Sequence, residues 1–238
     1  MQRVAGPSRS GVGAMFDRIA PRYDLLNRAL SFGLDVGWRK RVVAELPAGR
    51  GLRVLDVATG TADLAIALAR SPRVESVVGV DIAERMLAEG RQKVRAAGLE
   101  ASIRLVYGDA ADLHAHREFD AATIAFGIRN VPDPVAVMRQ MREAVRPAGR
   151  VLVLELSEPR SPVLGPIYRA YRRNVVPRIG GLVSGDSAAY AYLDETIATF
   201  PAGEAFLALM REAGLTAVTA APLALGAVTL YAGFAPEG

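Results

Sequence analysis

The chain has 238 residues, of which 51% are hydrophobic and 23% charged, and its formal net charge is +4. This balance is typical of a globular protein with a sizeable core and argues against a disordered chain. Cysteine is absent, which excludes disulfides, thiolate metal ligands and a cysteine nucleophile and is consistent with a reducing compartment.

Residues 1–13 are rich in Gly, Ser and Arg and lack the apolar core of a secretory signal, so we expect a flexible tail. No segment holds the roughly 20 uninterrupted apolar residues that a membrane helix needs. The nearest one, 220–236, contains Pro222 and Gly226 and is predicted to form two strands. The positive charge gathers in 159–185, which has five arginines and no acid.

Residues 14–46 have the periodicity of amphipathic helices, with breaks expected at Pro21 and near Gly33. Beyond them, short apolar runs alternate with helical segments. The predicted strands are 52–57, 76–81, 102–107, 119–126, 149–157, 215–221 and 228–234, and the predicted helices are 61–70, 83–97, 133–145 and turns within 162–213. This alternation predicts an α/β fold with βαβ units and a parallel sheet.

The stretch 54–63, Val-Leu-Asp-Val-Ala-Thr-Gly-Thr-Ala-Asp, joins the first predicted strand to a helix. Such a strand–turn–helix brings backbone close to a ligand at the carboxyl end of a strand. The next predicted strand ends at Asp81, where a carboxylate can accept both hydroxyl protons of a ribose. Asp56, Gly60 and Asp81 together indicate a nucleoside-bearing cofactor.

A dinucleotide is the first alternative, but it needs a glycine-rich turn on which pyrophosphate can rest. The turn here has one glycine and is flanked by Asp56 and Asp63, which would repel phosphate. S-adenosylmethionine has no phosphate, and its ammonium and sulfonium groups would be attracted by these acids. The structural alternative for Asp63 is a first-turn acid that favours the helix dipole.

A third acid, Asp109, follows the third predicted strand after Gly108, a pair that in isolation is typical of an ordinary turn. In Rossmann-like methyltransferases this loop lies beside the adenine, where a carboxylate and the next backbone amide can contact the ring. The predicted S-adenosylmethionine contacts are Asp56, Gly60, Thr61, Asp81, Ile82, Asp109 and Ala110. No metal site is predicted.

Several segments outside this motif share the pattern of one family. They are 16–20, 23–27, 31–33, Trp38, 126–130, 154–157, 168–180, Asp186 and 190–193. In them the chain resembles the ubiquinone/menaquinone biosynthesis C-methyltransferases from about residue 15 to 234. The resemblance implies a Rossmann-like class I methyltransferase with a seven-stranded, mostly parallel sheet and a reversed edge strand. It also implies a single domain over 14–238, with a helical amino-terminal part (14–50) and a helical, lid-like insertion (158–200).

Four positions depart from the pattern of this family. Ala62 stands where a second glycine is usual, Asp35 where a histidine is usual, and Ala125 where some members carry serine. Arg-Pro-Ala-Gly at 146–149 replaces a usual Lys-Pro-Gly-Gly. We expect Ala62 to shift the backbone near the methionine end of the cofactor, and Asp35 removes any imidazole from that position.

The resemblance implies methyl transfer from S-adenosylmethionine to a ring carbon of a polyprenyl hydroquinone, a lipophilic quinol. Carbon is a poor nucleophile unless an adjacent phenol is partly ionised, and free phenols have a pKa of about 10. A group that accepts the proton or stabilises the phenolate would therefore help. The pattern of 15–27 favours demethylmenaquinol; a ubiquinone precursor or another small molecule are the alternatives.

The predicted catalytic residues are Tyr23, Asp24, Arg129 and Asn130. The guanidinium of Arg129 suits a phenolate, although a structural salt bridge is the alternative, and Tyr23-Asp24 has the alternative of a turn anchored to the core. The two histidines lie in the polar connection 114–118 and are not proposed as a base.

The basic segment 159–185 is predicted to form a lid over the acceptor. The alternatives are a helical excursion packed on the sheet and contact with anionic lipid where a polyprenyl tail emerges. We therefore expect a cytoplasmic protein, with peripheral contact at the inner face of the membrane as an extension. The sequence leaves open whether the protein forms a homo-oligomer.

The high pI, about 9.7, raises the alternative of RNA binding. Three features argue against it. Cysteine for covalent pyrimidine chemistry is absent, Phe-Gly-Ile-Arg at 126–129 replaces the run that holds a flipped base, and the basic segment has few aromatic residues for stacking. No nucleic-acid partner is expected.

Overall fold

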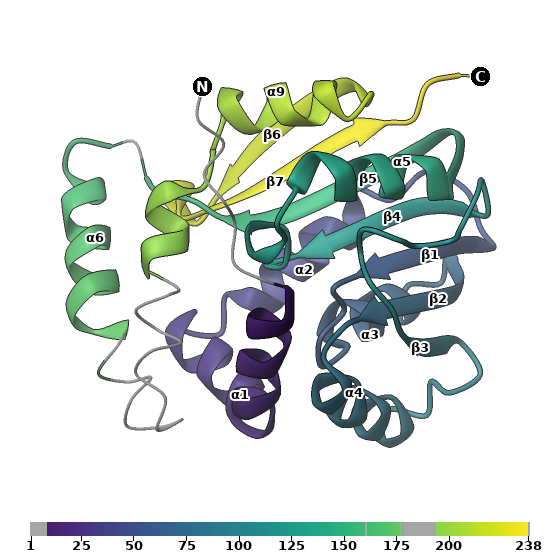
Figure 1. Ribbon diagram of the computed structural model, residues 1–238, viewed down its shortest axis with the longest axis horizontal. Coiled ribbons are helices and arrows are strands. Elements are labelled where there is room, and N and C mark those ends of the chain that lie inside the picture. The colour runs from purple at the N-terminus through teal and green to yellow at the C-terminus, as the bar shows by residue number, and fades with distance from the viewer. Residues whose placement is uncertain (1–8, 160, 177, 179–193, 238) are drawn as a thin grey trace.

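The computed structural model describes residues 9–159, 161–176, 178 and 194–237. Its strands are β1 (Leu52–Val57), β2 (Val74–Asp81), β3 (Ile103–Tyr107), β4 (Phe119–Ala125), β5 (Val145–Leu156), β6 (Thr216–Leu223) and β7 (Val228–Phe234). They form one sheet in the order β3-β2-β1-β4-β5-β7-β6 (Figure 1). From β1 the strand order runs outward through β2 and β3 on one side and through β4 and β5 on the other, so it reverses at β1. Open α/β sheets bind ligands at the carboxyl ends of the strands beside such a reversal.

Strands β1 to β5 pair in parallel, whereas β7 is antiparallel to both β5 and β6. The sheet therefore has seven strands and one reversed strand, as predicted. The reversed strand lies one place in from the edge, however, and not at the edge. The reason is the β6–β7 hairpin: its second strand inserts beside β5 and leaves β6 outermost.

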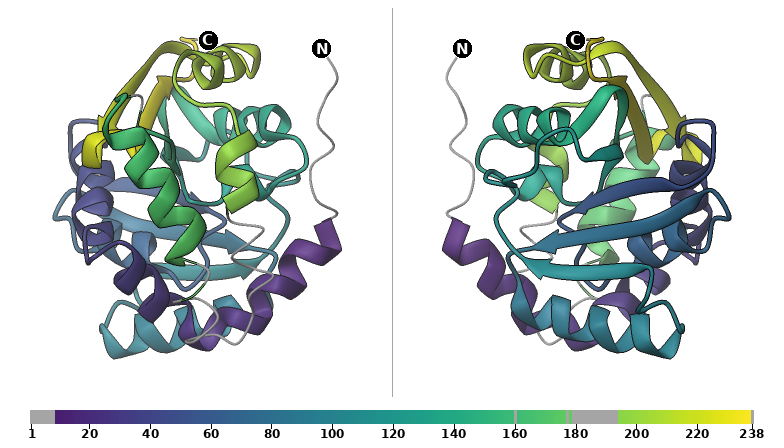
Figure 2. Two further views of the ribbon diagram at one scale, coloured as in Figure 1. Left: turned by 90° about the vertical axis from the view of Figure 1, so that its left-hand side faces the viewer. Right: turned by 90° about the vertical axis from the view of Figure 1, so that its right-hand side faces the viewer.

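Helices cover both faces of the sheet (Figures 1 and 2). They are α1 (Arg9–Leu30), α2 (Asp35–Ala44), α3 (Asp63–Ala69), α4 (Glu84–Ala96), α5 (Pro134–Ala144), α6 (Leu164–Asn174) and α9 (Glu204–Glu212), with helical turns η1 (Ile128–Asn130) and η2 (Ala224–Gly226) and a helical stretch 194–199. One core cluster joins α5 and α9 to the sheet, and another joins α2, α3 and α4. Burial of these apolar faces holds the three layers together.

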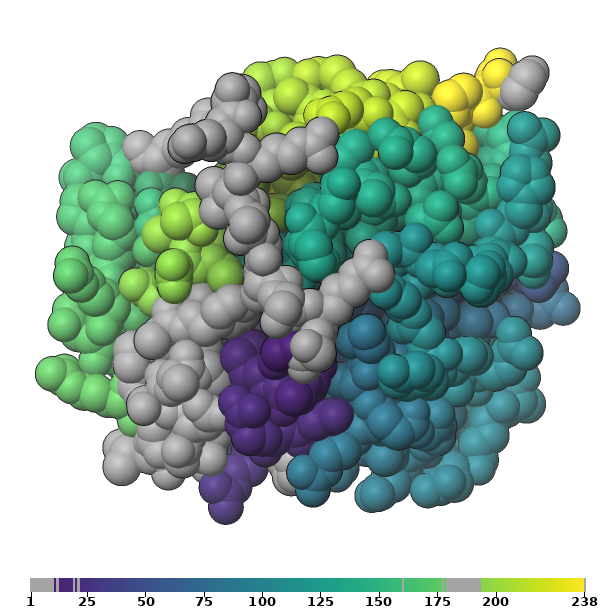
Figure 3. Space-filling view, viewed as in Figure 1, coloured from purple at the N-terminus to yellow at the C-terminus, as the bar shows by residue number. Residues whose placement is uncertain are grey.

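Helix α1 lies against α4 (Figure 3) and continues through residue 21, where a break was expected. A proline inside a helix removes one backbone hydrogen bond. Packing on both sides of that position offsets the loss, because Ala20 and Leu26 share a buried cluster with Met86 of α4. The helix also begins at Arg9, inside the stretch 1–13 for which a flexible tail was expected. The break near Gly33 is confirmed by a turn between α1 and α2.

Among the described residues, no helix combines the length and apolar character of a membrane span. Helices α1 and α6 lie beyond the ends to which β1 and β4 point (Figure 1). They therefore face the carboxyl end of β1, the strand that lies between β2 and β4. This position is where the polar residues predicted from the sequence gather.

Candidate active site

Three cavities meet at the carboxyl ends of the central strands. The strand-end cavity has an empty volume of about 960 Å³, partly open to solvent, and borders the ends of β2 and β4 and the loop after β3. The helix cavity, about 1120 Å³, lies among α1, α2, α6 and the turn after β4. The turn cavity, about 360 Å³, borders the β1–α3 turn. Tyr23 and Phe126 line all three.

The β1–α3 turn is built around a buried acid. Both carboxylate oxygens of Asp56 accept hydrogen bonds, from the hydroxyls of Thr59 and Thr123, each at 2.7 Å. Burial raises the pKa of Asp56 to about 6, although these two hydrogen bonds lower it. Asp56 and Thr61 line the turn cavity, as does Gly60.

Asp81 fastens the end of β2 to this turn. One carboxylate oxygen accepts from the Gly60 N–H at 2.7 Å, and the other accepts from the Ala83 N–H at 2.8 Å. Burial raises the pKa of Asp81, opposed by these backbone hydrogen bonds. A carboxylate oxygen can accept two hydrogen bonds, so Asp81 keeps acceptor capacity for a ligand in the strand-end cavity.

The remaining cofactor candidates also border the strand-end cavity: Ile82, Asp109 and Ala110 line it together with Gly60 and Asp81. The Asp109 carboxylate accepts from the Ala111 N–H at 2.8 Å, which orients the loop after β3. All seven residues predicted from three separate strand ends thus line two adjoining cavities.

Asp24 lies apart from its neighbour Tyr23, because it lines none of the three cavities. Its carboxylate accepts from the Thr61 hydroxyl at 2.5 Å and pairs with Lys93 of α4, which also pairs with Asp63. Burial by itself would raise the pKa of Asp63, but the cations Arg39 and Lys93 lower it below its ordinary value. Asp24 therefore joins α1 to the cofactor turn and to α4.

Arg39 is a site residue that the sequence analysis missed. It is 7% exposed, pairs with Asp35 and with Asp63 (3.3 Å), and lines both the helix cavity and the turn cavity. Its position beside Trp38, which belongs to the family pattern, is a weak signal, because only tertiary packing turns α2 toward the β1–α3 turn. Asp35, which replaces the family's histidine, is the buried partner of this arginine.

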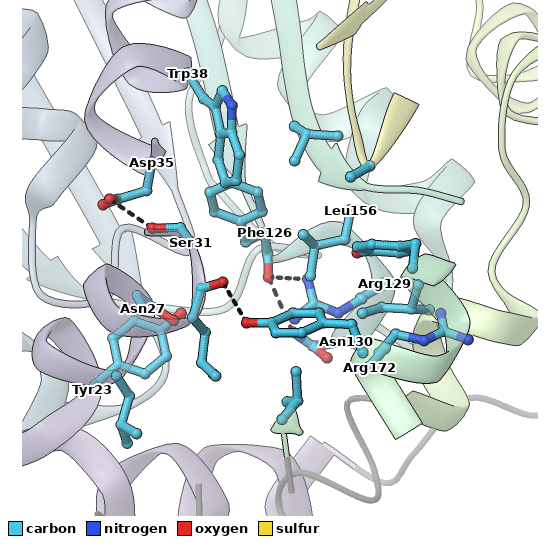
Figure 4. A pocket seen from close by; sticks show the side chains of 18 of the residues that line it. Tyr23, Asn27, Ser31, Asp35, Trp38, Phe126, Arg129, Asn130, Leu156 and Arg172 are labelled. Atoms are coloured by element: carbon cyan, nitrogen blue, oxygen red, sulfur yellow. Dashed lines mark hydrogen bonds between the residues drawn. The ribbon is translucent and has the colours of Figure 1, made fainter. Parts of the chain in front are cut away.

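Tyr23 lines all three cavities, and Figure 4 shows its side chain at the helix cavity. Burial raises the pKa of its hydroxyl, opposed by a hydrogen bond from the Asn27 side chain and by the charges of Arg129 and Arg39. The phenol is therefore protonated at neutral pH and can donate a hydrogen bond.

Arg129 lines the helix cavity at the turn after β4 (Figure 4). Its Nη1 donates to Glu155 at 2.5 Å and to the Phe126 carbonyl at 2.8 Å. Its Nη2 has no protein partner among the described residues. Asn130 donates to the same carbonyl at 3.3 Å and lines both larger cavities. Arg129 thus forms the buried salt bridge that was the structural alternative and also borders the cavity, and its role at a phenolate stays a prediction.

The fold and the acids at successive strand ends define a methyltransferase of the Rossmann-like class I. A solved SAM-dependent methyltransferase of Thermotoga maritima has the same fold, with a TM-score of 0.66 at 19% identity over 93% of this chain and 99% of that one. A SAM-dependent methyltransferase of Aquifex aeolicus matches with a TM-score of 0.56 at 15% identity, over 83% and 89%.

The chain belongs to the ubiE/COQ5 methyltransferase family, whose model matches residues 3–235. It is 48% identical to the ubiquinone/menaquinone biosynthesis C-methyltransferase UbiE of Syntrophotalea carbinolica, over 92% of each chain. It is 48% identical to the demethylmenaquinone methyltransferase of Deinococcus radiodurans, over 85% of this chain and 84% of that one. It is 45% identical to that of Thermus thermophilus, over 93% and 100%. The resemblance predicted from the sequence is confirmed.

Proposed function

We propose that the protein transfers the methyl group of S-adenosylmethionine to a ring carbon of demethylmenaquinol and so forms menaquinol. The observation that carries this proposal is the meeting of two mostly apolar cavities at Tyr23 and Phe126: the strand-end cavity, which Asp81 and Asp109 border, and the larger helix cavity. Relatives named demethylmenaquinone methyltransferase support the choice of acceptor.

S-adenosylmethionine is the cofactor, and the residues fit its parts. Its adenosine would occupy the strand-end cavity, with the ribose on Asp81 and Ile82 and the adenine on Asp109 and Ala110. Its methionine end would occupy the turn cavity beside Gly60 and Thr61. There Arg39 supplies a cation for the carboxylate, and the acids Asp56 and Asp63 favour the ammonium.

The quinol would lie in the helix cavity with one oxygen toward Arg129. As the ring carbon would form its bond to the methyl group, the carbon–sulfur bond would break, S-adenosylhomocysteine would be the leaving group, and the proton of that ring carbon would pass to solvent. Arg129 Nη2 stabilises the phenolate that makes the carbon nucleophilic, and the protonated Tyr23 donates a hydrogen bond nearby. Glu155 positions Arg129, Asn130 holds the Phe126 carbonyl to which Arg129 also donates, and Asp24 holds α1 in place.

The described part of the basic segment 159–185 is the basis for two further proposals, a cover for this cavity and a contact with lipid. Helix α6 brings Tyr168, Tyr171 and Arg172 to the helix cavity, and the Tyr171 hydroxyl donates to the Leu30 carbonyl at 3.0 Å. We propose that α6 covers the acceptor and that its outer face touches the membrane surface. Asp186 and 190–193, also part of the family pattern, lie outside the described residues.

The test is an assay with labelled S-adenosylmethionine and two reduced acceptors, demethylmenaquinol and a demethoxy-type benzoquinol. We expect label to enter demethylmenaquinol with the higher kcat/KM. A preference for the benzoquinol would favour the ubiquinone precursor. Label in neither quinol, together with transfer to an unrelated acceptor, would overturn the proposal.

A further inference from the structure

Four aromatic side chains of the described residues surround the junction of the cavities. Phe16 and Tyr23 meet edge to face with ring centroids 6.0 Å apart, and Trp38 and Phe126 meet similarly at 6.1 Å. Phe16 lines both larger cavities, Trp38 lines the helix cavity, and the other two line all three. An aromatic wall thus stands where a methyl group must pass from one cavity to the other.

Phe126 reaches this wall through a strained backbone. Its φ of +58° lies in the left-handed region, which a bulky side chain rarely adopts because of steric strain. Three hydrogen bonds hold it there: its N–H donates to the Leu154 carbonyl at 2.8 Å, and its carbonyl accepts from Arg129 and Asn130. Strain that neighbours impose in this way is typical of functional sites.

The turn after β4 is also pressed against the turn after β1. A Cβ on Gly127 would lie 2.7 Å from the Cβ of Ala58, so only glycine fits between these two turns. This close approach places the Phe126 ring beside the β1–α3 turn, where the methionine end of the cofactor is proposed to lie. The strain and the tight approach therefore have one result, which is to hold the Phe126 ring at the turn cavity.

We propose that Phe126 and Tyr23, braced by Trp38 and Phe16, form an aromatic box that binds the sulfonium cation of S-adenosylmethionine. The inference rests on the proposed function and adds the recognition of the cofactor's charge. The face of an aromatic ring attracts a cation, and the attraction grows when water is excluded. The product S-adenosylhomocysteine has a neutral thioether, so the box binds the donor in preference to the product and favours product release.

Calorimetry of both ligands tests the box without any acceptor. In Phe126→Leu, which keeps an apolar side chain, we expect the Kd of S-adenosylmethionine to rise about 3- to 10-fold and that of S-adenosylhomocysteine to change less than about twofold. The matched control is Phe119→Leu, a buried phenylalanine at the opposite end of β4 that borders none of the three cavities. It should leave the ratio of the two Kd values unchanged.

A second pair of variants distinguishes the effect of the Tyr23 ring from that of its hydroxyl. Tyr23→Phe keeps the ring and should keep the wild-type ratio of Kd values, whereas Tyr23→Leu should lower the preference for the sulfonium. Equal changes for both ligands, or no change for either, would show that these rings only pack and would overturn the box. If the wild-type protein bound neither ligand, the proposed function itself would fail.

Discussion

Among the described residues, five alanines have a left-handed backbone, a conformation that favours glycine, and two of them stand where the family usually has glycine. Ala62 begins α3 with φ +66°, and Ala148 lies in the bulged start of β5 with φ +57°. The bulge arises because Val145 pairs with Phe119 while Arg150 pairs with Ala121, so extra residues loop out between them. Ala62 therefore adopts the left-handed conformation that glycine favours and carries its strain, and the backbone shift expected near the methionine end of the cofactor stays a prediction.

Replacing Ala148 by glycine should stabilise the protein. Ala148 is exposed, so the substitution loses no buried contact. The substitution removes the strain of a left-handed alanine, but glycine also has more entropy in the unfolded chain, which offsets part of the gain. The net effect should be a free energy of unfolding higher by about 0.5–1 kcal/mol. Urea unfolding measures it. The control Ala96→Gly, exposed in helix α4, should lower the free energy instead, and equal effects of the two changes would contradict the explanation.

Asp56 predicts a dependence of stability on pH. Its pKa rises from 3.8 in the unfolded chain to about 6 in the folded protein. Between about pH 4 and pH 6 the folded state therefore binds more protons, so the stability contributed by Asp56 falls as pH rises and then levels off above pH 6. The total is about 3 kcal/mol by proton linkage.

Urea unfolding of the unliganded protein at pH 4 and pH 7 checks this expectation. Asp56→Asn cannot ionise, yet it keeps an oxygen that accepts from a threonine hydroxyl. The variant should lose less stability than the wild type between the two pH values. An identical loss in both proteins would show that Asp56 does not titrate in this range.

At the scale of elements, a buried ion pair fixes the turn after β4 to strand β5. The side chains of Arg129 and Glu155 are 7% and 1% exposed, and the Arg129 N–H also donates to Glu155 at 3.3 Å. A buried pair contributes little net stability, but either charge left alone in this place is costly. The pair therefore aims Arg129 at the helix cavity more than it strengthens the fold.

Glu155→Leu should accordingly lower the free energy of unfolding by about 3–5 kcal/mol, because it leaves the buried guanidinium of Arg129 without a counter-charge. The double change Glu155→Leu with Arg129→Met should restore most of that loss while methyl transfer stays low. Urea unfolding and the quinol assay together measure both effects. If the double variant is no more stable than Glu155→Leu, the unpaired buried charge of Arg129 is not the cause of the lost stability.

At the scale of the whole molecule, four exposed apolar side chains lie on two segments that border the helix cavity. Phe32 (78% exposed) and Leu34 (54%) lie in the turn between α1 and α2, and Val163 (66%) and Ile167 (62%) lie at α6. The rings of Phe32 and Tyr171 are 5.9 Å apart, so the turn adjoins α6. Arginines on α6 complete a surface suited to anionic lipid.

The double variant Phe32→Ser with Ile167→Ser should bind vesicles of anionic phospholipid about tenfold more weakly. Neither residue lines the helix cavity, so turnover of a quinol with a short, soluble tail should not change. Co-sedimentation measures the binding. Leu225→Ser, 77% exposed on the β6–β7 hairpin, is the control and should bind normally. Unchanged vesicle binding by the double variant would contradict the proposed surface.

The sequence by itself determined the fold class, the cofactor turn and the acids at three strand ends. These are local signals, since apolar period, turn chemistry and an acid after a strand are each set within a few residues. The continuation of α1 through residue 21 and the place of the reversed strand depended on packing against other elements, which local patterns do not encode.

Tertiary structure alone decided which polar residues face a cavity. Tyr23 and Asp24 are adjacent in the chain, yet one lies at the junction of the cavities and the other pairs with Lys93. Arg39 reaches the cofactor turn from a helix that precedes it, and Phe126 meets Trp38 across a long stretch of chain. Such contacts arise from the crossing of elements distant in sequence, and they bring the donor turn and the acceptor cavity to one point.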